Sequence, residues 1–222
     1  MARPIDPEPR PRVPPLGWTH RSIPHDFAVG LPEPASLPRI DFSTVLDLRR
    51  SQNGDSLDVN KLSTLLFHAT RQRDAGLGRF ERTWKSRPSP SAGGLHVLRL
   101  LAIPVGFGIT GVHDVEKHRL LAYNDDKSVK HLNALSLEKL TGAKSGTTLQ
   151  FFADQQELES CYENSSSLLW RDSGALSTVI SLVATALGLT SVTLGRAGTE
   201  FLSALRIGEP FIGCGAIHIG SK

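Results

Sequence analysis

A long apolar segment, residues 168–187, constrains the fold more than any other part of this 222-residue chain. Its apolar side chains recur at helical spacing but occupy too many faces for a surface helix. The segment therefore predicts a long helix, either central to the core or in the seam of a dimer. Gly188 follows directly, and glycine is typical of the residue after a helix.

Shorter elements surround this segment. The patterns of apolar, capping and turn residues predict helices from Asp41, from Asp58, over 135–140 and from a cap at Thr199; strands over 98–103, 147–152, 191–194 and from Pro210; and a hairpin over 106–125 that turns at 114–117. Helices mixed with several short strands predict an α+β domain.

The N-terminal region has a different composition. Ten of the 14 prolines lie in residues 1–38, which therefore cannot form a continuous helix or a central strand. We predict a Pro-rich extended arm over 1–38 and a folded domain over 39–222. The arm is either a flexible tail or a segment that wraps a partner subunit. Trp18 and Phe27 favour docking, because aromatic residues are depleted in disordered segments.

Charge and cysteine content exclude several classes of function. Twenty-five basic residues nearly balance 22 acidic ones, and no dense basic patch points to a nucleic-acid partner. Cys161 and Cys214 are too few for a disulfide framework, and the eight histidines show no metal-ligand spacing. We expect no metal site. Because no segment has the apolar length of a membrane span or a secretory signal, we expect a cytoplasmic protein without a membrane partner.

Three motifs occur in a suggestive order. They are Leu48-Arg49-Arg50-Ser51, the run Pro88-Ser89-Pro90-Ser91-Ala92-Gly93-Gly94-Leu95-His96, and the helix that ends in Ala186-Leu187-Gly188-Leu189. Their order and spacing resemble the nitroreductase superfamily, most closely its SagB-type branch of peptide azoline dehydrogenases, over roughly residues 30–220. The resemblance implies a nitroreductase-like fold, with a central mixed or antiparallel sheet flanked by helices, in an FMN-binding homodimer.

The resemblance also implies which residues hold the cofactor. Arg49 and Ser51, with Arg50 adjacent, would contact the FMN phosphate and ribityl chain, and Asn53 stands where a further basic residue is usual. Main-chain groups would approach the isoalloxazine across the dimer interface from Pro90, Ser91, Ala92, Gly93 and Gly94. The turn at Leu194 and Gly195 would face the reactive flavin nitrogen, and Arg196 could neutralise charge on the reduced ring.

An azoline dehydrogenase also needs a base that takes a proton from the ring, and no residue matches the base of the family directly. The SagB-type branch carries a Lys-Tyr pair about fourteen residues before the Gly of the helix start, here Asp172-Ser173-Gly174, but residues 159–163 contain no lysine. Tyr162 could replace the tyrosine with a one-residue shift. Glu163 or His96 could supply a base if partly buried.

The resemblance implies an FMN-dependent oxidoreductase that oxidises azoline-type rings, or a related heterocycle, in a modified peptide or small molecule. One alternative is an NAD(P)H-dependent nitro or quinone reductase. The other is a non-catalytic subunit of a peptide-modifying complex that works with partner enzymes. The missing lysine and the presence of Asn53 favour this last possibility.

Overall fold

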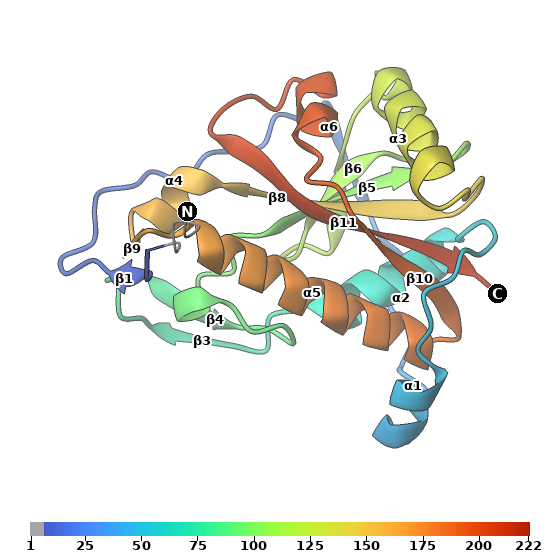
Figure 1. Cartoon of the computed structure of the whole chain (residues 1–222), viewed down its shortest axis with the longest axis horizontal. Coiled ribbons are helices and arrows are strands. Elements are labelled where there is room, and N and C mark those ends of the chain that lie inside the picture. Colours follow the sequence, from blue (N-terminus) through green and yellow to red (C-terminus); the bar gives the residue numbers. More distant parts are fainter. Residues whose placement is uncertain (1–6) are drawn as a thin grey trace, which may run out of the picture.

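A seven-stranded sheet forms the centre of the molecule (Figure 1) in this computed structural model, which describes residues 7–222. The first six residues of the predicted arm lie outside the described residues. The strand order is β10-β11-β8-β5-β6-β7-β2, and every neighbouring pair is antiparallel. The α+β prediction is confirmed, and the sheet is antiparallel rather than mixed. The strands are β2 (Phe27–Gly30), β5 (Arg99–Pro104), β6 (Gly111–Asp114), β7 (Arg119–Ala122), β8 (Thr147–Asp154), β10 (Leu189–Leu194) and β11 (Phe211–Ser221).

Helices cover both faces of this sheet. Helices α2 (Val59–Thr70) and α5 (Ser166–Ala186) pack on one face, and α3 (Lys127–Leu140) and α6 (Thr199–Ala204) pack on the other. Strand β5 shows the alternation: Leu100 and Ala102 join the cluster under α2 and α5, whereas Leu101 and Ile103 join the opposite cluster. One face of α5, with Leu169, Leu176 and Ile180, therefore packs in the core, which is one of the two positions that its apolar pattern predicts. Trp170 on its outer side is exposed.

The sequence signals for helix ends succeed in two places and fail in one. The Asp58 carboxylate accepts hydrogen bonds from the backbone N–H groups of Asn60 and Lys61 (2.9 and 3.0 Å), so it caps α2. Gly188 has φ +70°, the left-handed conformation that favours glycine after a helix. Thr199 is the first residue of α6 rather than its cap. Gly198 occupies the cap position, and the Thr199 hydroxyl accepts from the Gly213 N–H instead.

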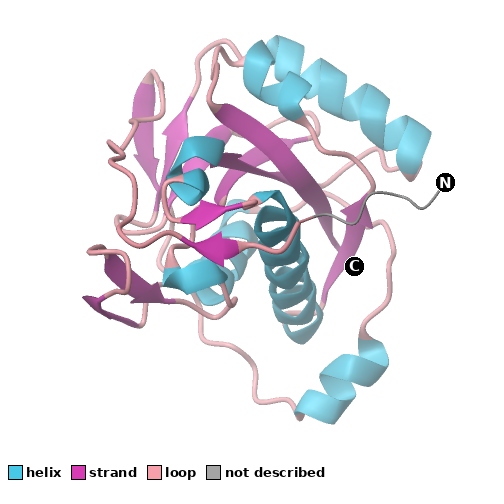
Figure 2. Cartoon of the chain, turned by 60° about the vertical axis from the view of Figure 1, so that its left-hand side comes forward, coloured by secondary structure: helices cyan, strands magenta, loops and turns pink. Residues whose placement is uncertain are grey.

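Several small elements complete the chain. The sequence patterns did not predict the hairpin of β3 (Asp74–Leu77) and β4 (Thr83–Ser86). This hairpin precedes the 3₁₀ turn η1 (Ala92–Gly94). Helix α1 (Phe42–Leu48) projects from the body (Figure 1), with only Val45 buried. The remaining elements are α4 (Gln155–Glu159) and the paired short strands β1 (Arg10–Pro11) and β9 (Tyr162–Glu163), all labelled in Figure 1. Figure 2 shows the helices and strands of the chain from a second direction.

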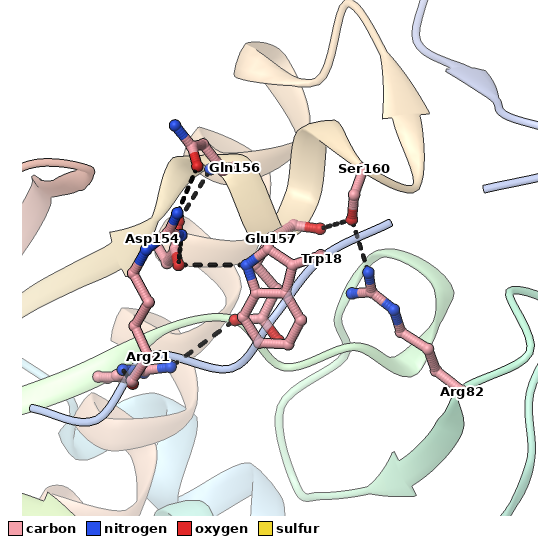
Figure 3. A network of polar contacts seen from close by, with 8 residues as sticks. Trp18, Arg21, Arg82, Asp154, Gln156, Glu157 and Ser160 are labelled. Atoms are coloured by element: carbon pink, nitrogen blue, oxygen red, sulfur yellow. Dashed lines mark hydrogen bonds and ion pairs between the residues drawn. The ribbon is translucent and has the colours of Figure 1, made fainter. Parts of the chain in front are cut away.

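The Pro-rich segment docks on the same chain. Its strand β2 forms one edge of the sheet by pairing with β7, a position that spares the prolines around it from ladder bonds. Farther back, Trp18 Nε1 and Arg21 Nη1 both donate to the carboxylate of Asp154 (3.2 and 2.7 Å; Figure 3). Asp154 is fully buried at the end of β8. Residues before position 38 thus contribute to the sheet formed by residues after it.

Candidate functional site

A buried carboxylate holds the loop that contains Ser91. Asp172, inside α5, accepts from the Ser91 hydroxyl (2.6 Å) and from the Ala92 N–H (3.1 Å). The same hydroxyl oxygen accepts from the His96 N–H (3.0 Å). Burial raises the pKa of Asp172, although both hydrogen bonds oppose that shift. Asp172 is a site residue that the sequence motifs did not predict. An acidic residue within an otherwise apolar helix is the signal that could have identified it.

The glycines of this loop are required by the loop itself. Gly93 and Gly94 have φ values of +60° and +65°. A Cβ on Gly93 would lie 2.8 Å from the Phe80 ring and 2.9 Å from the Tyr162 hydroxyl. Left-handed backbone and close neighbours therefore explain glycine at position 93 without any ligand. Pro90 is exposed at the start of the loop.

The structure brings two of the three candidate bases near this loop. Tyr162 packs edge-on against Phe80 with its hydroxyl beside Gly93, and burial raises its pKa. His96 Nε2 contacts the Lys85 carbonyl (2.7 Å), so the neutral ring donates there and leaves Nδ1 as an acceptor. Burial, followed by the charge of Arg87, lowers the pKa of His96 to about 4. Glu163 is exposed and forms an ion pair with Arg12 (3.2 Å).

The predicted phosphate-binding residues lie beside β10. Ser51 forms an isolated parallel bridge with Ser191, and the Gln52 N–H donates to the Ser191 carbonyl (3.1 Å). Within residues 7–222, neither Arg49 nor Arg50 has a carboxylate within 4.0 Å. This leaves two cations near β10 available to an anion. The Asn53 amide donates to the Thr141 carbonyl (2.8 Å), so it is occupied by the chain itself.

The turn after β10 combines open backbone with a half-buried cation. Leu194 is buried, whereas Gly195 is exposed; a Cβ on Gly195 would meet nothing within 4 Å, and its φ lies outside the left-handed region. Nothing in the described chain therefore requires glycine there. Arg196 donates to the amide oxygens of Gln150 (3.2 Å) and Asn133 (2.8 Å).

No carboxylate in the described part of the chain lies within 4.0 Å of the Arg196 guanidinium. Its Nη1 is buried without a hydrogen-bond partner, and the guanidinium lies 3.9 Å from the centroid of the Phe201 ring. Burial lowers the pKa of Arg196 to about 10, so the group is charged at neutral pH. Glu200 opposes this pKa shift without an ion-pair contact. A half-buried cation that contacts no carboxylate is costly, and an anionic ligand at the turn would reduce that cost.

Helix α5 separates the two groups of candidate residues. The loop at Ser91 contacts Asp172, whereas Ser191, which pairs with Ser51, contacts Ser181 (3.0 Å). Positions 172 and 181 are nine positions apart in the helix, a distance of about 14 Å along the helix axis at 1.5 Å per residue. In one chain, the Arg49–Ser51 segment and the Ser91 loop therefore lie near different parts of α5.

Two further findings concern the described residues only. No helix in residues 7–222 combines the length and hydropathy needed to cross a bilayer. Over the same range, no three His, Cys, Asp or Glu side chains gather as metal ligands.

The architecture is that of a known group of solved structures. A protein from Ralstonia eutropha assigned as a nitroreductase matches 94% of this chain and 93% of its own, with a TM-score of 0.62 and 21% identity. The chain has the nitroreductase fold. A chain of the Escherichia coli microcin synthetase McbBCD complex, solved with truncated pro-MccB17 bound, matches 86% of this chain and 76% of its own (TM-score 0.59, 15% identity).

A third similar structure was solved with a cofactor. A protein from Desulfovibrio desulfuricans, assigned as a nitroreductase and in complex with FMN, matches 82% of this chain and 87% of its own, with a TM-score of 0.52 and 18% identity. No protein-family model matches the sequence, and no curated protein matches it significantly. At these identities the likeness establishes the fold.

Buried histidines should make the protein sensitive to acid. Burial, with His118 as a neighbour, lowers the pKa of His113 from 6.5 to about 3. The unfolded chain binds the extra proton first, so stability falls as the pH drops from 6.5 towards 3. We expect His113 alone to contribute a loss of about 3 kcal/mol between pH 6.5 and 4, at about 1.4 kcal/mol per pKa unit. The free energy of unfolding of H113Q, measured in urea, should depend less steeply on pH than that of wild type. An equal pH dependence in the two proteins would contradict the low pKa of His113.

Proposed function

We propose that this protein is an FMN-dependent oxidoreductase whose cofactor sites are shared between two copies of the chain. The observation that carries the proposal is the turn after β10. Glycine at position 195 has no local explanation there, and no carboxylate of the described residues lies within 4.0 Å of the adjacent Arg196 guanidinium. An exposed backbone lets a flat ring approach closely. The cation beside it would stabilise negative charge on a reduced ring.

The remaining donors fit the other end of the same cofactor. Arg49, Arg50 and Ser51 offer cationic and hydroxyl donors to a phosphate near β10. Asn53 supplies no charge there, and one missing charge-assisted hydrogen bond weakens binding by about 1–3 kcal/mol. The Ser91 loop offers small residues held by Asp172, which would place its backbone against the ring.

A homodimer would assemble these separated parts. The apolar residues of α1 are largely exposed: Phe42 by 66%, Leu46 by 50% and Leu48 by 51%. A projecting helix with three exposed apolar side chains is typical of an interface. Trp170, on the outer side of α5, is also 51% exposed. In the proposed dimer, the Arg49–Ser51 segment of one copy faces the Ser91 loop of the other.

We expect the double substitution R49A/S51A to remove FMN from a protein that stays folded. Ser51 is exposed and Arg49 lies at the end of α1, so neither supports the core. Loss of two phosphate contacts should weaken binding by about 3 kcal/mol, or more than 100-fold. FMN retained after gel filtration, with circular dichroism as the folding control, measures this. Unchanged FMN occupancy would contradict the assignment.

Complementation between two defective variants tests the shared site. P90E alters an exposed loop residue and should also lose FMN. When R49A/S51A and P90E are unfolded, mixed and refolded together, half of the dimers combine the two. Each such dimer has one intact site, so about a quarter of all sites should bind FMN. A flavin-free mixture, when wild type treated identically recovers FMN, would contradict the shared site.

We propose an azoline-type ring in a modified peptide as the substrate. The fold likeness to a chain of the microcin synthetase complex and the SagB-like motif order support this choice. Bound FMN would accept a hydride from the ring. The chain must then take a proton, and His96 Nδ1 and the Tyr162 hydroxyl are the candidate groups near the Ser91 loop. Glu163 would first have to leave Arg12.

Reduction kinetics separate this substrate from the rival. If NADH reduces the bound FMN rapidly, the protein is a nitro or quinone reductase. If NADH leaves it oxidised while a peptide azoline bleaches it, the dehydrogenase assignment holds. FMN that neither compound reduces would favour a non-catalytic subunit.

A further inference from the structure

A cavity of about 600 Å³ lies inside one subunit, behind the Ser91 loop. Segments far apart in sequence enclose it: the N-terminal arm from Trp18 to His25, the stretch after β4, and the β6–β7 hairpin. Neither the Arg49–Ser51 segment nor Gly195 lines it. The cavity is therefore distinct from those two cofactor-binding elements, but it shares the Ser91 loop and His96 with the proposed cofactor and substrate site.

The wall of the cavity carries more positive than negative charge. Four carboxylates belong to Asp114, Glu116, Glu157 and Asp172. Six cations belong to Arg82, Lys85, Arg87, Arg99, Lys117 and Arg119. Three cations are paired, in Lys85–Glu116 (2.6 Å), Arg119–Asp114 (2.8 Å) and Arg99–Glu157 (3.8 Å). The fourth carboxylate, that of Asp172, accepts hydrogen bonds from Ser91 and Ala92.

Two guanidinium groups in this wall have no carboxylate in contact. Glu116 and Glu157, which are near enough to oppose the pKa shift of Arg87, are paired with Lys85 and Arg99. Within the described residues, neither Arg82 nor Arg87 has a carboxylate within 4.0 Å. Arg82 Nη2 donates to the Ser160 hydroxyl (2.7 Å; Figure 3), and its guanidinium lies 4.8 Å from the centroid of the Trp18 ring. Arg82 Nη1 and Arg87 Nε are buried without any hydrogen-bond partner.

This arrangement is unfavourable in the isolated chain. A buried N–H of a charged group that lacks an acceptor costs more than a neutral one. Burial accordingly lowers the pKa of Arg87. An oxyanion is the natural acceptor, because the planar fork of a guanidinium matches the oxygens of a carboxylate or a phosphate.

The rest of the wall suits the organic part of such an anion. Ile23, Leu95 and Leu98 contribute apolar surface. His113 and His96 add no charge at neutral pH, because burial lowers the pKa of each well below 7. Small-molecule sites combine apolar surface with polar groups that fix the orientation of the ligand, and this wall supplies both.

We propose that this cavity binds a small organic anion, whose carboxylate or phosphate is held by Arg82 and Arg87 and whose apolar part lies against Ile23, Leu95 and Leu98. The N-terminal arm, through Trp18, forms the wall over Arg82. The site is complete within one subunit and does not depend on FMN.

Calorimetry with simple probes tests this site on the full-length protein. Benzoate and phenyl phosphate carry the two oxyanions on the same ring, and benzyl alcohol is the uncharged control. We expect saturable binding of at least one anion, with no binding of benzyl alcohol. Preference for benzoate would identify a carboxylate ligand, and preference for phenyl phosphate a phosphate ligand. Absence of saturable binding for both would overturn the proposal.

Variants locate the binding. R87Q and R82Q should each weaken it at least tenfold, whereas R39Q, which alters an exposed arginine without an ion pair in the described structure, should not change it. Equal affinity in folded R87Q and R82Q would overturn the assignment. R49A/S51A should keep wild-type affinity for the anion while losing FMN, so failure of the proposed function and failure of this site give different results.

Discussion

Replacing Gly195 with valine should give a folded protein that no longer retains FMN. A side chain there meets nothing within 4 Å of the chain, and the backbone is not left-handed, so folding is unaffected. The same side chain would occupy the space in which the proposed ring lies. We expect FMN binding to weaken about 100-fold, or about 2.7 kcal/mol. Fluorescence titration with FMN measures the effect.

Gly30 supplies a matched control for this substitution. It lies in β2, a Cβ there also meets nothing within 4 Å, and its φ is likewise outside the left-handed region. G30V should therefore bind FMN as wild type does. Equal FMN affinity in G195V and G30V would show that the turn after β10 does not face the flavin. By contrast, G93V would disturb Phe80 and Tyr162, so it cannot separate folding from binding.

Replacing Asp154 with alanine should destabilise the protein by about 3 kcal/mol, the lower end for breaking a buried charged pair. Its buried carboxylate accepts from both Trp18 and Arg21 and also from the Gln156 N–H (3.0 Å), so the substitution removes the polar anchor of the N-terminal arm. Urea unfolding measures the loss. Limited proteolysis should cut the arm faster in D154A than in wild type.

Asp125 provides the control for that experiment. It is exposed, and no ion pair or side-chain hydrogen bond in the described structure involves it. D125A should change stability by less than about 0.5 kcal/mol, as surface substitutions usually do. If D154A unfolds at the same urea concentration as D125A, the arm is not anchored through Asp154.

Local patterns predicted the elements whose formation depends on nearby residues. The apolar periodicity of 168–187 predicted α5, the Asp58 cap predicted α2, and the turn at 114–117 lies between β6 and β7. Helix α3 begins at 127, well before the predicted 135. The apolar pattern missed its first half because only Val129 and Asn133 are buried there.

These local signals could not predict which distant segments pair with one another. Strand β2 forms because Phe27–Gly30 meets β7, about ninety residues later, and nothing within the Pro-rich segment indicates that partner. The same holds for the candidate site. The motifs indicated the Ser91 loop and Arg196, but the carboxylate that anchors the loop is Asp172, 80 residues from Ala92. The hydrogen bonds of Arg196 to Gln150 and Asn133 likewise could not be predicted from the sequence, because both partners are distant along the chain.

The most direct test of the account is the visible absorption spectrum of the purified protein, before and after incubation with excess FMN and removal of the free cofactor. The released cofactor would be identified by mass. The account predicts one FMN per subunit, in a protein that elutes as a dimer. A folded protein that retains no FMN after this treatment would contradict it and would favour a non-catalytic subunit with the nitroreductase fold.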